Sequence, residues 1–338
     1  CPADPVATAA KKTAGLMAAI RHVAVIDIGK TNAKVALVGL ETLSEVAVRR
    51  TANRPIAEGP YRHHDVEGLW NFILESLAAL NRGQKIDAIS VTTHGATAVL
   101  LGADGSLALP VLDYEDDGPA SLRVSYDALR PKFEETGSPP LQNGLNLGAQ
   151  LFWQSRAFPD AFGRVATILT YPQYWGWRLT GVTASEVTSL GCHTDLWNPY
   201  HGDFSTFVDR MRWRKLFPSL LPASARLGTL RPEFAARSGL DPSTPVHCGI
   251  HDSNASLLPH LLARKAPFSV VSTGTWVVSI TVGGHDVALD PARDTLVNVN
   301  ALGDPVRSAR FMGGREFELL AAGLDTGEDD DAMAAVLE

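Results

Sequence analysis

The residues near the start of the chain whose types best suit chemistry are Asp27 and the short turn after it, Gly29-Lys30-Thr31-Asn32. An acidic residue at the end of a buried strand is costly unless it is paired or holds a metal ion. A glycine-containing turn beside it can direct several backbone N–H groups at one anion. A carboxylate for Mg²⁺ and amides for phosphate oxygens together indicate a nucleotide phosphate site. The alternative is an ordinary hairpin whose aspartate is satisfied by the turn's own amides.

The segments on either side of this turn predict which structure holds it. Two apolar runs, Val23–Ile28 and Val35–Val38, are joined by a few Gly/Asn-type residues, a pattern typical of a β-hairpin. Gly29-Lys30-Thr31 also looks like the end of a P-loop. That motif requires a glycine where Ala24 stands, and a helix after the loop. We therefore expect a hairpin.

A second carboxylate, Asp252, follows the apolar run Pro245–Ile250, and a helix is expected from about Ser253 to Leu262. An aspartate in this place suits a general base that takes a proton from a hydroxyl group. The dipole of the following helix would keep it ionised. Aspartate is also a good N-cap, so a purely structural role is the alternative.

A second glycine-containing turn holds Gly274 and Thr275, between apolar runs at Phe268–Ser272 and Val277–Thr281. The pattern of strand, turn and strand is similar to that of the first hairpin, which indicates that the chain has two related halves. Backbone and hydroxyl donors in such a turn would suit phosphate oxygens.

Further polar residues come after the strand predicted at Ile86–Thr93. His94 and Gly95 follow it directly, and functional residues often sit at the carboxyl ends of strands in α/β sheets. Asp113 and Glu115 stand in an acidic loop. Imidazole and carboxylate groups suit the recognition of hydroxyl groups, although an acidic loop is more often simply solvated.

Composition narrows the class of protein. A length of 338 residues suggests two domains or one large one. The net charge of −7 argues against a nucleic-acid surface, and no apolar run approaches the ~18 residues of a membrane span. Three cysteines make no disulfide framework, so a cytoplasmic protein is expected. Residues 1–21, rich in alanine near their start, are expected to be an extraneous or disordered leader, with Met17 as the natural start.

Taken in order, these segments resemble the FGGY family of carbohydrate kinases, within the actin/hexokinase/Hsp70 superfamily. The resemblance covers Val23 to about Leu324, and its motifs are specific as an ordered set rather than singly. The matching segments are DIGKTNAK from Asp27, Thr93-His94-Gly95, RLTGVTASEVTSL from Arg178, GIHDSNASL from Gly249, STGTW from Ser272 and FMGGREFE from Phe311. The STGTW turn and the His-Asp dipeptide look more like rhamnulose or fuculose kinases than glycerol kinases. The sequence departs from the family at Ser243, where GTPV would have glycine, and at Tyr114-Glu115, where many relatives have Trp and Asp.

The resemblance implies an α/β fold with two ribonuclease-H-like (actin-like ATPase) domains around a cleft. Residues 22–244 would form the sugar-binding domain and 245–338 the start of the nucleotide-binding domain. The second domain looks incomplete, because no adenine loop or closing helices of the family follow Gly323. Weak nucleotide binding by this chain alone is therefore expected. The implied activity is ATP-dependent phosphorylation of a sugar hydroxyl, with ATP and Mg²⁺ as cofactors and a sugar, such as a ketose, as the small-molecule partner; a homodimer is compatible with it.

The resemblance also implies roles for individual residues. Asp252 would be the catalytic base, and Asp27 would act through Mg²⁺ with waters between them. The phosphate-binding set would be Gly29, Thr31, Asn32, Gly274 and Thr275, with Lys30 either attracting ATP or standing in solvent. The sugar-binding set would be His94, Gly95, Asp113, Glu115 and Asp252. A non-catalytic actin-like nucleotide- or sugar-binding regulator and a phosphohydrolase of the same superfamily are the alternatives.

Overall fold

The N-terminal strands form the predicted hairpin, and this hairpin starts the larger of two main sheets. The computed structural model describes residues 20–273, 276–285 and 287–321. Strands β1 (His22–Ile28) and β2 (Asn32–Gly39) pair antiparallel, with Asp27 opposite Lys34. Because the Gly-Lys-Thr turn leads into a strand and not a helix, the hairpin prediction is confirmed and the P-loop interpretation is wrong.

The larger sheet has seven strands and mixes antiparallel and parallel pairs. Its order is β3-β2-β1-β4-β10-β9, and β11 also pairs with β4. Strand β4 runs parallel to β1, so the carboxyl ends of both strands meet at one edge. The remaining strands of this sheet are β3 (Ser44–Ala52), β4 (Ala88–Thr93), β9 (Arg226–Thr229), β10 (Pro245–His247) and β11 (Ile250–His251).

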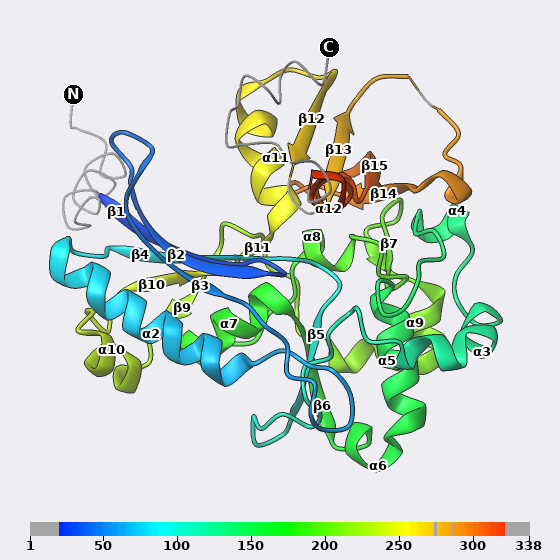
Figure 1. Cartoon of the computed structure of the whole chain (residues 1–338), viewed down its shortest axis with the longest axis horizontal. Helices are drawn as coiled ribbons and strands as arrows, with labels where there is room; N and C mark the ends of the chain where they lie inside the picture. Colours follow the sequence, from blue (N-terminus) through cyan, green and yellow to red (C-terminus); the bar gives the residue numbers. More distant parts are fainter. Residues whose placement is uncertain (1–19, 274–275, 286, 322–338) are drawn as a thin grey trace, which may run out of the picture.

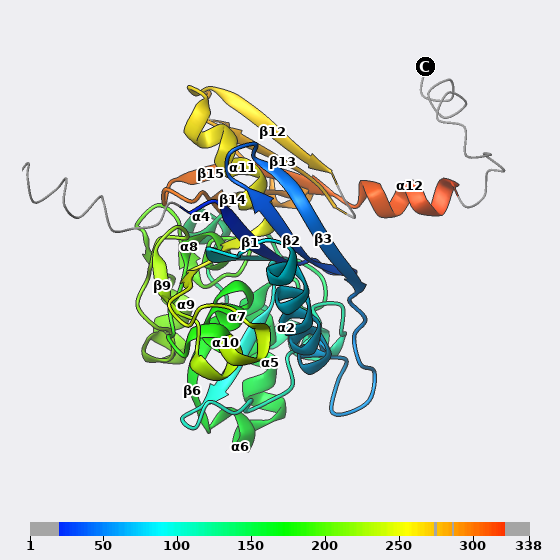
Figure 2. The ribbon, with the colours of Figure 1, turned by 90° about the vertical axis from the view of Figure 1, so that its left-hand side faces the viewer.

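Helices cover one face of this sheet (Figures 1 and 2), namely α2 (Val66–Gly83), α7 (Tyr171–Thr180) and α10 (Pro232–Ser238). Asp65 caps α2, because its side chain accepts a hydrogen bond from Gly68 N at 2.8 Å. Helix α7 ends at Gly181, whose φ of +82° is one that glycine adopts without strain. Apolar side chains of strands and helices interlock in one core that includes Ile26, Ile73 and Trp175.

A second core lies beside the sheet and is built mostly from short helices around a two-stranded sheet. In that sheet β5 (Ala98–Gly102) pairs antiparallel with β6 (Val165–Thr170). The helices of this part are α3 (Arg123–Asp127), α4 (Phe133–Thr136), α5 (Leu147–Ala157), α6 (Pro159–Phe162), α8 (Val187–Leu190) and α9 (Thr206–Met211). Short strands β7 (Trp197–Asn198) and β8 (Asp203–Phe204), and single turns of 3-10 helix at Gly118–Leu122 and Arg214–Leu216, complete it.

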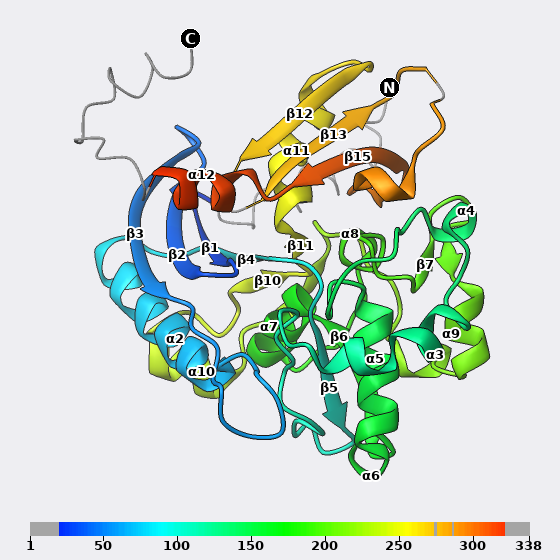
Figure 3. The same ribbon diagram turned by 45° about the vertical axis from the view of Figure 1, so that its right-hand side comes forward.

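The second main sheet has four strands in the order β12-β13-β15-β14. Figure 3 shows helix α11 leading from the end of β11 to this sheet. Strands β12 and β13 pair as the second hairpin predicted from the sequence. The elements are α11 (Asp252–Ala263), β12 (Phe268–Thr273), β13 (Val277–Val282), a 3-10 turn at Pro291–Arg293, β14 (Thr295–Val299), β15 (Pro305–Phe311) and α12 (Gly313–Ala321).

The change from one sheet to the other occurs later than the sequence suggested. The second domain was expected to begin at residue 245, but β10 and β11 both hydrogen-bond to β4 in the first sheet. The first sheet therefore extends to His251, and α11 makes the connection. No helix in the described part of the chain is both long and apolar enough to span a membrane.

Candidate active site

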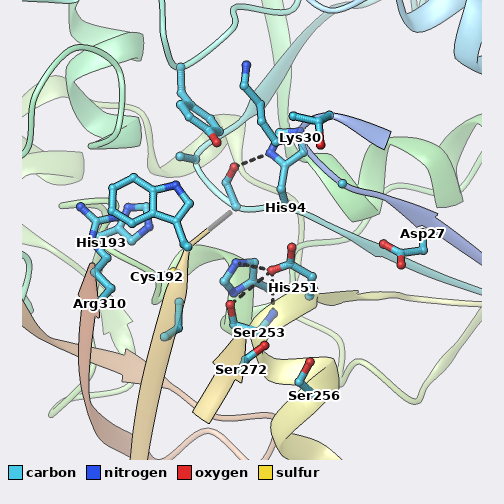
Figure 4. Close-up of a pocket in the computed structure, with 18 of the residues that line it drawn as sticks. Asp27, Lys30, His94, Cys192, His193, His251, Ser253, Ser256, Ser272 and Arg310 are labelled. Atoms are coloured by element: carbon cyan, nitrogen blue, oxygen red, sulfur yellow. Dashed lines mark hydrogen bonds and ion pairs between the residues drawn. The ribbon is translucent and has the colours of Figure 1, made fainter. Parts of the chain in front are cut away.

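A cavity of about 660 Å³ is lined by residues of both main sheets, a volume typical of small-molecule sites. Asp27, His94 and Asp252, three of the polar residues singled out in the sequence, all line it. Gly274 and Thr275 lie outside the described residues, but Thr273 and Trp276 on either side of them line the same cavity. Figure 4 shows Asp27 and His94 around this cavity together with Ser253 and Ser256 of α11. The geometry thus brings the two carboxylates and the flanks of the second turn to one place.

Asp27 lies at the carboxyl end of β1, with about a third of its side chain exposed. Its Oδ2 is 3.5 Å from Lys34 Nζ on the neighbouring strand. Burial raises the pKa of Asp27 and the charge of Asp252 adds to this, while Lys34 opposes both. A partly buried carboxylate facing a second carboxylate suits a cation that can offset both charges. One carboxylate with room for water is a donor set that Mg²⁺ accepts, so the residues present fit this ion.

The turn after Asp27 is fastened by a residue that the sequence analysis missed. Asn53, buried just after β3, donates from Nδ2 to Gly29 O at 2.7 Å and from its backbone N to Thr31 O at 2.8 Å. In both hydrogen bonds the acceptor is a backbone carbonyl group of the turn. The side chains of Thr31 and Asn32 take no part in them, and both residues line the cavity. Gly29 cannot gain a side chain without strain, because a Cβ there would lie 3.0 Å from Asn32 O.

Lys30 is paired with the acidic loop and is not free in solvent. Its Nζ contacts Asp113 Oδ1 and lies 3.5 Å from Glu115 Oε2, and it sits 4.7 Å from the centre of the Tyr114 ring. Burial alone would raise the pKa of Asp113, but the hydrogen bond and charge of Lys30 hold that pKa below its usual range. Arg62 Nε forms an ion pair with the other Asp113 oxygen, at a distance of 2.8 Å.

These pairs decide which part of the acidic loop meets the cavity. Of the loop's residues, Tyr114 lines the cavity, whereas the carboxylates of Asp113 and Glu115 are turned to Lys30 and Arg62. A contact from these two carboxylates to a ligand therefore needs a rearrangement of the ion pairs.

His94 lines the cavity, and one of its ring nitrogens is free to accept a hydrogen bond. Its Nδ1 lies 2.8 Å from Gly95 O, and because a carbonyl oxygen only accepts, Nδ1 carries the proton. Burial lowers the pKa of His94 to about 4, so the ring is neutral near pH 7 and Nε2 has a free lone pair. This Nε2 is buried and has no partner among the described residues. A ligand hydroxyl could donate to it.

Gly95 has a structural role in addition to any contact with a ligand. A Cβ at this position would lie 2.9 Å from Nε2 of His251, so the missing side chain lets that ring approach. His251 Nε2 in turn lies 3.1 Å from Asp252 Oδ1. The glycine that follows the strand β4 is thus one reason why the His-Asp pair can form.

Asp252 is the first residue of α11, and its carboxylate is held at one oxygen. Oδ1 accepts hydrogen bonds from Ser253 N at 2.6 Å and faces His251 Nε2. Oδ2 makes no contact of this kind with the described residues. Burial opposes ionisation of Asp252, but His251 outweighs it and keeps the pKa of Asp252 below its usual range. The site therefore holds an ionised carboxylate with one oxygen available.

A buried glutamate, Glu186, is connected to His251 through two successive hydrogen bonds. The backbone N of His251 donates to Thr188 Oγ1 at 3.1 Å, and Thr188 Oγ1 donates to Glu186 Oε2 at 2.5 Å. Glu186 is fully buried and also accepts from the amides of Thr188 and Ser189 at the start of α8. Burial raises the pKa of Glu186 from 4.5 to about 7, against the pull of these hydrogen bonds.

We expect this glutamate to make the free energy of unfolding depend on pH. Because the pKa of Glu186 is higher in the folded state, its favourable contribution is complete below about pH 4.5 and is lost as the pH rises through 7. The loss amounts to roughly 2–3 kcal/mol between about pH 5 and pH 8. Glu186→Gln, neutral at every pH, should remove this part of the slope in urea unfolding. An unchanged difference between variant and wild type at the two pH values would contradict the assignment.

Three further cavity residues were not foreseen: Cys192, His193 and Arg310. Burial alone would raise the pKa of Cys192, but the imidazoles of His193 and His251 lower it to about 5. No sequence spacing links residues 192, 251 and 310. The available signal was the alternation in β15, where Val306, Ser308 and Arg310 are buried on one face.

Comparisons with known proteins agree with this geometry. The profile described as "FGGY family of carbohydrate kinases, N-terminal domain" matches residues 22–259, and "Carbohydrate kinase FGGY, C-terminal domain" matches residues 265–338. The two matches meet near the end of α11.

Among curated proteins, an L-fuculokinase of Salmonella typhi is 27% identical over 203 residues, which are 59% of this chain and 42% of that protein. A rhamnulokinase of Bacteroides thetaiotaomicron is 24% identical over 261 residues, which are 74% of this chain and 53% of that protein. The chain thus spans about half the length of the curated relatives it matches.

Among solved structures, a carbohydrate kinase from Novosphingobium aromaticivorans is 39% identical, with a TM-score of 0.83 over 91% of this chain and 66% of that one. A xylulose kinase from Rhodospirillum rubrum, 23% identical, shares the fold with a TM-score of 0.75 over 93% of this chain and 66% of that one. The expected α/β fold with actin-like ATPase architecture is confirmed by these neighbours. The family profile covers well over half of the chain, and the chain belongs to the FGGY family of carbohydrate kinases.

Proposed function

We propose that this protein transfers the γ-phosphoryl group of ATP to a hydroxyl group of a sugar. The observation that carries the proposal is the convergence of Asp27, Asp252 and the flanks of the Gly274-Thr275 turn on one cavity. Phosphoryl transfer needs little covalent chemistry from the protein beyond positioning and charge neutralisation. An ionised carboxylate for the acceptor and a carboxylate-plus-turn for the phosphates are the parts that such a reaction requires.

In this proposal Asp252 is the general base. Its free Oδ2 takes the proton of the attacking hydroxyl, while His251 and Ser253 N hold Oδ1 and so set the direction of the carboxylate. His94 Nε2 accepts a hydrogen bond from another hydroxyl of the acceptor. Tyr114 and Trp276 supply apolar walls beside it.

Asp27 and the turn after it form the phosphate end of the site. Asp27 would hold Mg²⁺ through waters, and the ion would offset negative charge on the phosphoryl oxygens when bound. Thr31 and Asn32 donate to phosphate oxygens from the turn that Asn53 fastens. We assign phosphate binding to Gly274 and Thr275 as well, from their sequence alone. Lys30 is assigned to the acidic loop, and we do not count it among the ATP contacts.

The acceptor class is proposed from the relatives. The printed names of the curated relatives, L-fuculokinase and rhamnulokinase, favour a ketose of the deoxyketohexose kind. The substrate of this chain is a proposal in the same sense as its activity.

A coupled assay of ADP release with ATP, with and without Mg²⁺, tests the function across ketoses, polyols and sugar acids. Turnover that depends on both the sugar and Mg²⁺ is the expected result. ADP release without sugar would instead identify a phosphohydrolase. Sugar binding by calorimetry with no turnover under any condition would identify a binding module.

A further inference from the structure

Arg310 is a buried cation in the wall of the cavity. It lies on β15, opposite Val278 of β13, and only 9% of the residue is exposed. Val278 and Arg310 both line the cavity, as do Leu296 and Asn298 of the neighbouring strand β14. The inward face of the second sheet therefore carries one guanidinium among neutral side chains, both polar and apolar.

This guanidinium has no acidic partner in the described part of the chain. No Asp or Glu carboxylate lies within 4.0 Å of it there, and its buried Nε has no hydrogen-bond partner. Its one described side-chain contact is the ring of Trp276, whose centre is 4.8 Å from Arg310 Cζ. Lysines and arginines are almost never buried without a partner, because an uncompensated charge in an apolar setting is costly. Arg130 shows the usual arrangement, because its largely buried guanidinium pairs with the buried carboxylate of Asp195 at 2.8 Å.

The stacking on Trp276 leaves the edge of the guanidinium for a ligand. A planar group held by its face presents its N–H donors at the rim, which is the geometry that carboxylate and phosphate groups match with two parallel hydrogen bonds. On the neighbouring strand of the same cavity wall, Asn298 Oδ1 is also buried without a partner among the described residues, while its Nδ2 donates to Ser308 Oγ at 2.9 Å. Unused polar atoms on an inward face indicate a site completed by a bound molecule.

Position in the cavity shows which end of a ligand Arg310 would meet. In Figure 4, Arg310, Cys192 and His193 lie on one side of the view and Asp27 on the other, with His251 and His94 between them. If the phosphate end is at Asp27 and the acceptor hydroxyl is at the His251-Asp252 pair, Arg310 lies in this view on the side of that pair away from Asp27. An anion bound there belongs to the acceptor.

We propose that Arg310 binds a carboxylate of the acceptor. The acceptor would then be a sugar acid, in place of the neutral ketose that the names of the relatives alone favour. The proposal rests on the proposed function, because the orientation of the acceptor depends on Asp27 marking the phosphate end. It also distinguishes this chain from kinases named for neutral ketoses. The chemical class is a polyhydroxy acid, with its carboxylate on Arg310 and a distal hydroxyl at Asp252.

One competing explanation uses only the protein. Cys192, as a thiolate, would be the counter-ion of Arg310, since its negative charge raises the pKa of Arg310 against the effect of burial. Cys192 is already flanked by His193 and His251, two other groups that can balance a thiolate. The two explanations differ in what happens when the arginine is replaced by an apolar side chain of similar length.

Binding measurements without ATP test the proposal directly. Thermal shift and calorimetry would compare D-gluconate, D-galactonate and 5-keto-D-gluconate with sorbitol, L-fuculose and L-rhamnulose. We expect the acids to bind more tightly than the neutral compounds, and Arg310→Gln to weaken the acids by about 10- to 100-fold with neutral compounds unchanged. Arg307→Gln is the matched control, because it removes the same charge from the same strand at a position of opposite register.

Three results would overturn the proposal. The acids and neutral compounds could bind equally to the wild type, or Arg310→Gln could leave acid binding intact. Arg310→Gln could also weaken inorganic phosphate and ADP in place of the acids, which would move the anion to the nucleotide. Without ligand, Arg310→Met should melt no lower than wild type, because it removes an unpaired buried charge. A marked loss of stability in that variant would favour the pairing with Cys192.

Failure of this inference can be told from failure of the proposed function. Acid binding that depends on Arg310 without any ATP turnover would leave the subsite in place and remove the kinase activity from this chain. Turnover of neutral ketoses with no response to the acids would keep the kinase and remove the subsite.

Discussion

Asp252→Asn is expected to lower the rate of sugar-dependent ADP release by about 100- to 10,000-fold, while sugar affinity changes by no more than a few-fold. Asparagine has the shape of aspartate, and its oxygen can still accept the hydrogen bond from Ser253 N. It cannot take a proton from a hydroxyl group. The chemical step should therefore be lost and the binding step kept, as measured by the coupled assay and by calorimetry.

A control for this variant is Asp241→Asn in an exposed turn. Asp241 accepts hydrogen bonds from Ser243 N and Oγ, and so matches Asp252 in its local bonding but lies outside the cavity. Its variant should keep wild-type turnover. Turnover of Asp252→Asn within ten-fold of wild type would remove the base from this residue, and loss of sugar binding would show that the variant acts through structure.

Asp195→Asn is expected to lower the free energy of unfolding by about 3–5 kcal/mol. Asp195 is fully buried and holds Arg130 through bonds of 2.8 and 3.1 Å, and Tyr126 through a bond of 2.6 Å. The substitution leaves the Arg130 guanidinium buried without its counter-charge. Backbone strain adds little, because the φ of +62° at residue 195 is one that asparagine tolerates. Urea unfolding at pH 7 measures the effect.

The matched comparison is Asp203→Asn, which breaks an exposed ion pair. Arg214 lies 2.7 Å from Asp203, and about half of each side chain is exposed. Exposed pairs contribute about 0–1 kcal/mol, so this variant should unfold close to wild type. Equal losses in the two variants would show that burial is not what makes the Asp195 pair matter. A double variant, Asp195→Asn with Arg130→Met, should recover much of the loss, because no charge is then left unpaired and asparagine tolerates the backbone conformation at residue 195.

Local patterns were enough to predict the elements that carry the chemistry. Apolar, β-branched runs around a short polar turn predicted both hairpins. They also predicted that Asp27, His94 and Asp252 follow strands, which brings them to the cavity where parallel strands end together. Such inferences succeed because they depend on neighbours within a few residues in sequence.

The assignments that needed the structure concern partners far apart in the chain. Lys30 has the sequence setting of a phosphate ligand, yet its ammonium contacts Asp113, 83 residues away. The sequence analysis placed Asp113 and Glu115 at the sugar; in the structure their carboxylates face Lys30 and Arg62. The sequence analysis placed Gly95 in the sugar-binding set, and the structure shows that its missing side chain also makes room for the ring of His251.

The sequence by itself determined the strands, the turns and the residue types that a phosphate site requires, because hydrogen-bonding pattern and side-chain period are local properties. Only the tertiary structure decided which charges are paired and which face the cavity. Neither Arg130 nor Arg310 stands in a sequence motif that sets it apart. In the structure Arg130 pairs with a buried carboxylate, whereas Arg310 contacts a tryptophan ring and lines the cavity. The energy of a charge depends on what surrounds it in space, and that is set by the packing of strands and helices from distant parts of the chain.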